Sequence, residues 1–195
     1  MTLTTPRRMS LEDYLNYDDG TDTRYELVDG VLVKIAPENP LNPQIAMFLA
    51  FAFGLLGLPP HRIVIGHQIA MKSPHATARQ PDLVVHSEAS EMALRSGSKI
   101  LTLDMPAPLL VVEVVSSSQT DPQSYDRDYQ QKRAEYADRG IGEYWIVDPE
   151  ASLVTVCNLT QATYQSTEFR GDSPIVSVTF PSLSLTANRI LTAGK

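Results

Sequence analysis

Cysteine is almost absent from this sequence: Cys157 is the only one, which excludes an intrachain disulfide and a cysteine-rich metal site. Long apolar runs are absent too. The longest, IAMFLAFAFGLLGL, is shorter than the roughly 20 residues that a membrane-spanning helix needs, and it predicts a buried helix instead. The opening segment MTLTTPRRMS lacks the apolar core of a signal peptide. These absences favour a cytoplasmic protein in a reducing compartment, with no membrane partner.

Positive charge is also scarce. Lys and Arg number 16 against 23 Asp and Glu, so the net charge is -7, which counts against nonspecific binding to a phosphate backbone. Acidic residues that hold divalent cations would instead present positive charge to a phosphate. With 195 residues, 43% of them apolar, the composition is that of an ordinary globular protein, and we expect one domain over residues 1–195.

The pattern of apolar residues and turn signals predicts alternating helices and strands. Helices are expected at 10–17, 44–57 and 124–139, the second of them apolar on nearly all sides and hence buried. A hairpin around Asp29-Gly30 is expected within 24–37, and strands at 61–72, 79–87, 108–116 and 143–149. The polar connection at 88–106 has room for a short helix.

The sequences SLVTVCNL, TYQSTEF and PIVSVTF predict an antiparallel, β-rich tail within residues 150–191. Ahead of it, strand 108–116, helix 124–139 and strand 143–149 form a βαβ unit, which predicts a parallel pair joined by a right-handed crossover. We therefore expect a mixed α/β (α+β) fold: a core over about 44–149, an N-terminal helix and hairpin over 10–36, and the β-rich tail.

Two acids stand in strands where a charge is costly. Glu113 lies in the middle of LLVVEVVSSS, an apolar run typical of a strand buried on both faces, and Asp82 follows Pro81 at the start of LVVH. If these two strands are neighbours, the two carboxylates converge on one point. Paired carboxylates repel unless a cation lies between them, and Mg2+ typically takes one or two carboxylates together with water and substrate phosphate.

The helix at 124–139 carries a lysine on an aromatic face. Tyr125, Tyr129, Lys132 and Tyr136 follow each other at spacings of four, three and four residues. We expect Lys132 to point inward or along the rim, where it could orient or deprotonate a water, or stabilise a phosphorus centre that gains charge.

A proline-aspartate pair followed by a strand with an internal glutamate resembles the PD-(D/E)XK nuclease superfamily, which has the restriction-endonuclease-like fold. The segments RYELVDG, RQPDLVV, LLVVEVVS and DYQQKRAEYADRGIGEYWIVDP more closely resemble the Uma-two-type restriction endonucleases, long labelled a domain of unknown function. The resemblance extends from about residue 9 to 191. It implies a metal-dependent endonuclease acting on DNA, with Mg2+ or Mn2+ as cofactor.

Carried over to this sequence, the resemblance implies that Asp82 and Glu113 bind the metal and that the Val114 backbone carbonyl adds a ligand. The motif lysine normally lies two positions after the strand acid, where this chain has Val115. Because the superfamily is known to relocate this lysine to the next helix, Lys132 is the candidate.

The same resemblance offers two additional site residues, Glu26 in YELVDG and Gln68 on the strand before the proline-aspartate pair. It also makes a homodimer plausible, because enzymes that cut both strands usually pair two sites, and the β-rich tail could supply a two-fold interface.

Other interpretations stay open at this point. Asp82 could cap a turn, Glu113 could form an ordinary salt bridge, and Lys132 could be a solvated helix residue. For the whole protein, the alternatives are a catalytically silent homodimeric nucleic-acid-binding or regulatory module on the same fold, and a sugar hydrolase with paired carboxylates.

Overall fold

The strands form two sheets in the computed structural model, which describes residues 8–35, 39–74, 77–116 and 125–195. The smaller sheet has the order β2 (Val31–Lys34), β1 (Tyr25–Val28), β5 (Thr77–Arg79), β4 (Ile69–Met71). The larger has the order β10 (Thr163–Phe169), β9 (Leu153–Thr160), β8 (Glu143–Asp148), β7 (Leu110–Val114), β6 (Leu83–Val85), β3 (Ile63–Ile65). Its β7–β8 pair is parallel and its other pairs are antiparallel, which confirms the predicted mixed α/β architecture.

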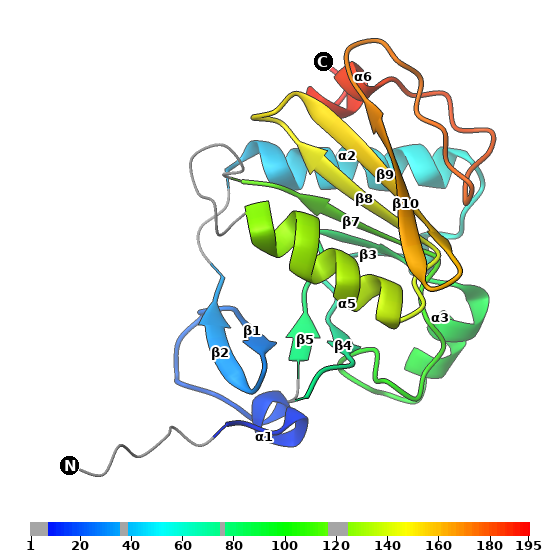
Figure 1. Cartoon of the computed structure of the whole chain (residues 1–195). Coiled ribbons are helices and arrows are strands. Elements are labelled where there is room, and N and C mark those ends of the chain that lie inside the picture. The colour runs from blue at the N-terminus through cyan, green and yellow to red at the C-terminus, as the bar shows by residue number, and fades with distance from the viewer. Residues whose placement is uncertain (1–7, 36–38, 75–76, 117–124) are drawn as a thin grey trace.

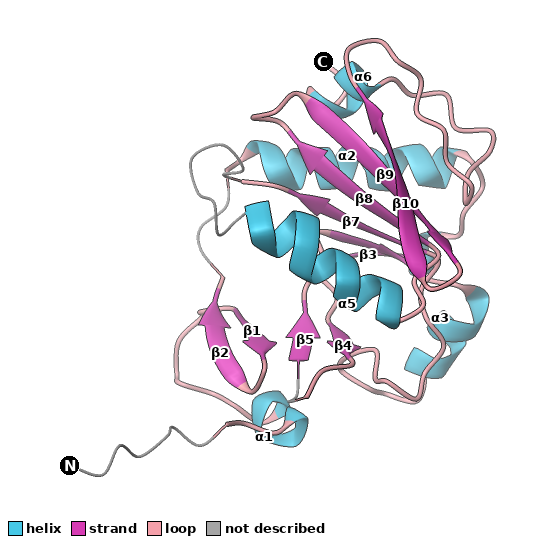
Figure 2. Ribbon diagram, in the orientation of Figure 1, coloured by secondary structure: helices cyan, strands magenta, loops and turns pink. Residues whose placement is uncertain are grey.

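The helices cover both faces of the larger sheet, with α2 (Leu41–Leu55) on one face and α5 (Lys132–Asp138) on the other (Figures 1 and 2). The described residues also form the α-helices α1 (Leu11–Leu15), α3 (Glu88–Leu94) and α6 (Ala187–Leu191). Alternation along β7 divides the core: Val112 and Val114 pack with the α2 side, whereas Val111 packs with the α5 side. Glu113 therefore faces α5.

The N-terminal helix and hairpin form as predicted. Ser10 caps α1 in a reciprocal capping box with Asp13. Asp29 and Gly30 both adopt positive φ, as a two-residue hairpin turn between β1 and β2 requires.

Two predicted strands are each split between the sheets. Residues 61–72 form β3 and β4 rather than one strand, because Gly66 turns the chain at a positive φ of 69°. Residues 79–87 contain the end of β5 and all of β6. Pro81 has no N–H for a ladder, and it separates the two strands immediately before Asp82.

The tail differs from the prediction after β10. The expected strand PIVSVTF is irregular, and the helix α6 follows it. The buried Glu143 carboxylate explains this path: it accepts hydrogen bonds from the Ser177 hydroxyl and from the Thr179 N–H, so a ladder cannot use that N–H. Only the first two tail strands are therefore confirmed.

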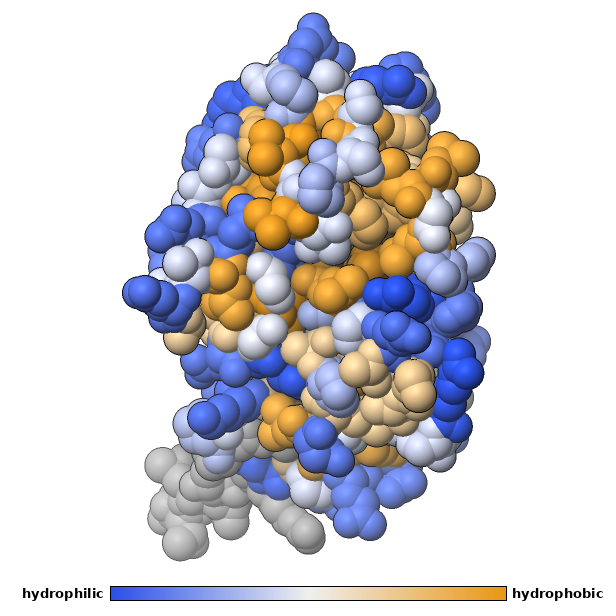
Figure 3. All heavy atoms as spheres, turned by 90° about the vertical axis from the view of Figure 1, so that its right-hand side faces the viewer, coloured by the Kyte–Doolittle hydropathy of each residue, from blue (hydrophilic) through white to orange (hydrophobic). Residues whose placement is uncertain are grey.

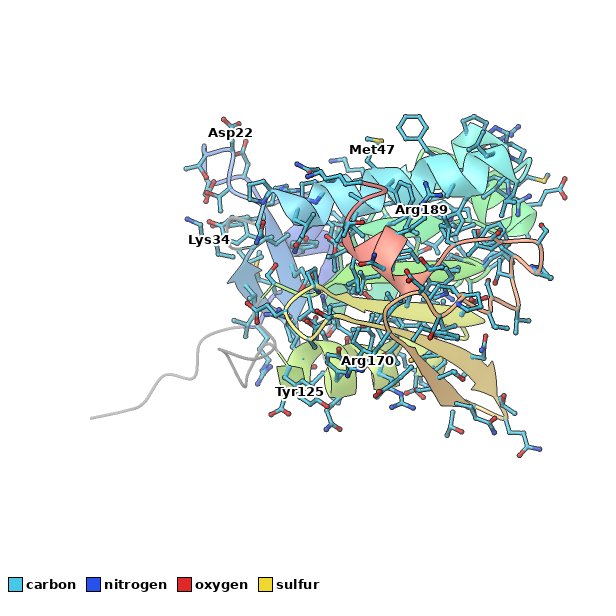
Figure 4. All side chains as sticks on the ribbon, turned by 90° about the horizontal axis from the view of Figure 1, so that it is seen from above. Asp22, Lys34, Met47, Tyr125, Arg170 and Arg189 are labelled. Carbon is cyan, nitrogen blue, oxygen red and sulfur yellow. The ribbon has the colours of Figure 1, made fainter. Side chains whose placement is uncertain are left out.

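Helix α2 begins three residues before the predicted start and is not buried on all sides. Leu49 and Phe53 are fully buried against the sheet, but Met47, Phe51 and Leu55 are exposed. Met47 projects away from the sheet in Figure 4. Apolar groups also gather on the molecular surface, over the upper half of the face shown in Figure 3, which is the right-hand side of Figure 1. An apolar sequence alone cannot distinguish a buried helix from a helix with an uncovered apolar side.

This two-sided character of α2 gives a stability prediction. Leu49→Ala should lower the free energy of unfolding by about 2–5 kcal/mol, because it opens a cavity in the core. Leu55→Ala, on the same helix but 88% exposed, should change it by no more than about 0.5 kcal/mol. Urea unfolding of both variants measures the difference, and equal losses would contradict this placement of the helix.

Candidate functional site

The two acids singled out in the sequence lie at neighbouring antiparallel strands, Glu113 within β7 and Asp82 immediately before β6. Leu83 of β6 pairs with Val112 of β7, so one further step in the same register brings Asp82 opposite Glu113. Side chains opposite each other on one face have Cβ atoms about 4.5–5.5 Å apart. The Asp82 carboxylate also accepts a hydrogen bond from the Val114 N–H at 2.6 Å, which fixes it against the end of β7.

Two side chains of α5 bind the Glu113 carboxylate. Its Oε2 lies 2.8 Å from the Lys132 Nζ, and its Oε1 accepts a hydrogen bond from the Tyr136 hydroxyl at 2.5 Å. Lys132 and Glu113 are only 6% and 5% exposed. The interpretation of Lys132 as a solvated helix residue is therefore wrong, whereas the salt bridge considered for Glu113 is present.

Asp128 completes a buried triad with these two residues. Its Oδ1 lies 3.1 Å from the Lys132 Nζ, and its Oδ2 lies 3.1 Å from an Arg127 guanidinium nitrogen. Lys132 thus bridges two carboxylates from one helix and one strand. Because an ammonium group between two acids is stabilised by both, the pKa of Lys132 lies above its ordinary value despite burial.

The helix carries a π-helical turn at this point. Over Arg127–Gln131 the hydrogen bonding changes from i→i−4 to i→i−5, and the Lys132 N–H bonds to the Arg127 carbonyl. Such turns occur frequently at functional sites. The predicted single aromatic face is divided: Lys132 and Tyr136 reach Glu113, whereas the Tyr129 hydroxyl bonds to Asp148 at the end of β8.

The charge on Glu113 is costly in this position. Burial raises the pKa of its carboxyl, Lys132 opposes the rise, and the negative charge of Asp82 adds to it, so that the pKa reaches about 8. The acid opposite Glu113 thus makes its ionisation harder, as expected for paired carboxylates.

Glu26 belongs to a second ion-pair network beside this site. Its Oε2 lies 3.1 Å from Arg79 on β5, and Arg79 also forms a two-pronged pair with Glu135 of α5, at 2.7 and 3.0 Å. Burial favours the neutral form of Glu26, but the charges of Lys132 and Arg79 outweigh burial and hold the pKa of its carboxyl below its ordinary value. This network joins the smaller sheet to α5.

The other two predicted site residues have described partners elsewhere. The Val114 carbonyl accepts a hydrogen bond from the Asn42 side chain of α2 at 3.0 Å. The Gln68 side-chain amide donates to the hydroxyl of Tyr14 on α1 at 2.6 Å, which connects it to the N-terminal segment.

The sequence analysis does not identify some residues of the site. Asp128 carried a signal, since an acid four residues before a lysine on a helix is a favourable pair. Arg79 carried none, because its role depends on the break between β5 and β6. Tyr136 was placed on the right helix face, but its hydrogen bond to Glu113 was not foreseen.

The comparisons with known proteins identify the family and the fold. The family model Uma2, described as "putative restriction endonuclease", matches residues 11–188. The chain belongs to the Uma2 family. The Uma2 match spans both sheets and every residue of the site described above.

A solved structure shares the fold of this Uma2 chain: a putative nuclease belonging to DUF820 from Anabaena variabilis ATCC 29413. The TM-score is 0.72 at 16% identity, and the match covers 96% of this chain and 99% of that chain. This likeness establishes the restriction-endonuclease-like fold. No curated protein matches the chain. Within the described residues, no helix has the length and apolar character needed to cross a membrane.

The buried triad gives a prediction for stability. Lys132→Met should destabilise the fold by about 3–5 kcal/mol, because it leaves two carboxylates buried without their shared cation. Adding Glu113→Gln should restore about 1 kcal/mol or more of that loss, since the neutral amide no longer needs a counter-charge. Guanidinium unfolding of the single and double variants measures this coupling; strictly additive losses would show that the pair does not interact.

Proposed function

We propose that this protein is a metal-dependent endonuclease that hydrolyses phosphodiester bonds of DNA, with Asp82 and Glu113 as ligands for Mg2+ or Mn2+ and Lys132 as an assisting cation. The observation that carries the proposal is the placement of Asp82 opposite Glu113, with Lys132 bonded to the second acid. Family membership supports the nuclease class, and DNA is the substrate that we propose within it.

The residues present fit a divalent cation. Five carboxylates surround three cationic groups in the linked networks: Glu26, Asp82, Glu113, Asp128 and Glu135 against Arg79, Arg127 and Lys132. The surplus is negative, and the nearby acids, Asp82 first among them, add to the rise that burial causes in the pKa of Glu113. A cation between Asp82 and Glu113 would remove the part of this rise that the Asp82 charge contributes.

The small number of protein ligands favours magnesium, which does not need a site formed entirely by side chains. Within the described ranges, no group of three or more His, Cys, Asp or Glu side chains is arranged to hold one metal ion. Mg2+ commonly uses one or two carboxylates and takes its other ligands from water and substrate phosphate. Two acids at the end of β7 match that pattern.

The bound metal would supply an activated water and neutralise charge on the phosphoryl group. Lys132, whose pKa is raised, stays protonated, so it acts as a cation and hydrogen-bond donor rather than as a general base. Tyr136 and Lys132 together fix both oxygens of Glu113 and thereby orient its remaining lone pairs. Asn42 fixes the Val114 carbonyl, which keeps one further lone pair for a ligand.

A homodimer is part of the proposal, because cutting both DNA strands requires two sites. The tail segment that departs from the predicted strand supports an interface there. It exposes Val176 and Val178, two β-branched apolar residues whose exposure costs free energy in an isolated chain.

One observation favours a second candidate, the catalytically silent nucleic-acid-binding or regulatory module. Both Glu113 oxygens already have partners, and Lys132 neutralises part of the charge without any metal. In that case the triad would be structural, and its acids would bind no metal.

An assay of DNA cleavage separates the two candidates. With Mg2+ or Mn2+ we expect nicking of plasmid DNA by the wild type and a loss of about 100-fold or more in Asp82→Asn, which keeps the size of the side chain and an acceptor for the Val114 N–H. Glu88→Gln, which removes an exposed acid at the start of α3, is the matched control and should cleave as the wild type does.

Thermal unfolding with added Mn2+ gives a readout independent of activity. The wild type should be stabilised as the ion concentration rises, and Asp82→Asn should not. If the wild type neither cleaves DNA nor responds to Mn2+, the endonuclease proposal is wrong and the silent module is the better account.

A further inference from the structure

A cavity of about 440 Å3 lies on the other flank of the site helix, between the π-helical turn and strands β8 to β10. Its lining includes Tyr125, Tyr129, Arg133, Thr155 and Arg170. Figure 4 shows Tyr125 and Arg170 close together at one edge of the molecule. The volume is within the range of small-ligand pockets, about 300–1,000 Å3. Neither metal binding nor the buried triad accounts for this cavity.

The two tyrosines form a platform whose outer ring is open. The rings of Tyr125 and Tyr129 are stacked, with centroids 4.4 Å apart and an angle of 14° between their planes. The inner ring is anchored by the hydrogen bond from the Tyr129 hydroxyl to Asp148 at 3.0 Å, whereas Tyr125 is 44% exposed. An anchored aromatic stack is suited to take a further flat ring.

A buried hydroxyl without a partner points to a ligand in the same cavity. Thr155 is 5% exposed, and among the described residues its buried Oγ1 has no hydrogen-bond partner. Buried hydroxyls are almost always paired in folded proteins, because an unpaired one loses its hydrogen bonds to water. A ligand atom that donates or accepts a hydrogen bond would satisfy it.

The charges around the cavity are mixed. Arg133 and Arg170 are both fixed by donating to backbone carbonyls, those of Tyr164 and Ala151. Glu168 lies 3.9 Å from Arg170 and also lines the cavity, so it offsets part of the positive charge. We therefore expect a neutral flat group, and not a phosphate alone, to contribute most of the binding.

The cavity shares a sheet face with the acid pair. In the register of the larger sheet Glu113 pairs with Ile146, Ile146 with Thr155, and Thr155 with Glu168. Thr155 is thus two strands from Glu113, or about 10 Å at the usual strand spacing. That is on the order of one or two nucleotides along a single strand.

We propose that this cavity is a subsite for one unstacked nucleobase of a nucleic acid strand, which stacks on Tyr125 and bonds to Thr155. The proposal rests on the proposed function only in that the strand is the substrate cleaved at Asp82 and Glu113. It assigns the enzyme a preference for DNA with a single-stranded or flipped-out nucleotide close to the scissile bond.

The test measures binding to two single-stranded probes in EDTA, so that no cleavage contributes. One probe is an eight-nucleotide abasic DNA backbone with a terminal fluorophore; the other has thymine at one central position. Fluorescence anisotropy should show that the single base tightens binding by the wild type by about tenfold. Tyr125→Ala should remove this gain, and Tyr125→Phe, which keeps the ring, should retain it.

Two further variants make the test specific. Thr155→Val, close to the same shape without the hydroxyl, should reduce the gain from the base while it leaves binding of the abasic backbone unchanged. Tyr17→Ala removes a similarly exposed tyrosine from an aromatic pair outside the cavity and should behave as the wild type.

The outcomes separate this inference from the proposed function. If the base adds nothing in the wild type, or if its gain survives Tyr125→Ala, the subsite proposal is overturned even when Mg2+-dependent cleavage is present. If the gain depends on Tyr125 but the wild type cleaves no DNA, the subsite stands and the endonuclease proposal falls.

Discussion

The buried pair of Glu113 and Lys132 is the interaction on which the rest of the structure depends. A carboxylate inside a five-residue strand whose residues are all buried needs a counter-charge, and the helix packed on that strand supplies it. The helix therefore has to lie with Lys132 over β7, which fixes the βαβ unit and places Asp128 and Tyr136 around the same acid. Replacing one partner would leave a charge that the core cannot accommodate.

The site also joins the two sheets. Asp82 lies just after the break that carries the chain from β5 to β6, and Arg79, three residues earlier, links Glu26 and Glu135. The end of β7, the start of β6 and the middle of α5 are thus held by hydrogen bonds and ion pairs in addition to apolar packing. Polar groups keep a precise geometry when all their hydrogen bonds are formed. A site for a metal and a phosphate needs such a geometry.

The acids and the lysine of the site could be predicted from the sequence, both from the free-energy cost of a buried charge and from the resemblance to a nuclease motif. Glu113 was noticeable because a charged residue in a buried strand has to be explained, and the spacing of the helix then indicated Lys132. The placement of Asp82 opposite Glu113 followed once β6 and β7 were neighbours. The predicted parallel pair of β7 and β8 also formed, because helical residues between two apolar strands leave few other topologies.

The features that the sequence did not predict depend on contacts distant along the chain. Gly66 and Pro81 divide two apolar segments between sheets, and their single-residue signals are weak within otherwise continuous runs. The path of PIVSVTF depends on Glu143, more than 30 residues earlier. The exposed side of α2 depends on what the rest of the fold leaves uncovered.

The Asp82 and Glu113 carboxylates are proposed to hold a metal ion between them, and a Mn2+ soak tests this proposal. Crystals grown without divalent ions and then soaked in Mn2+ should show an anomalous-scattering peak between the Asp82 and Glu113 carboxylates, within about 2–2.5 Å of an oxygen from each. The proposal is contradicted if no peak appears there while Lys132 remains bonded to Glu113. The ion pair alone would then account for the buried carboxylate.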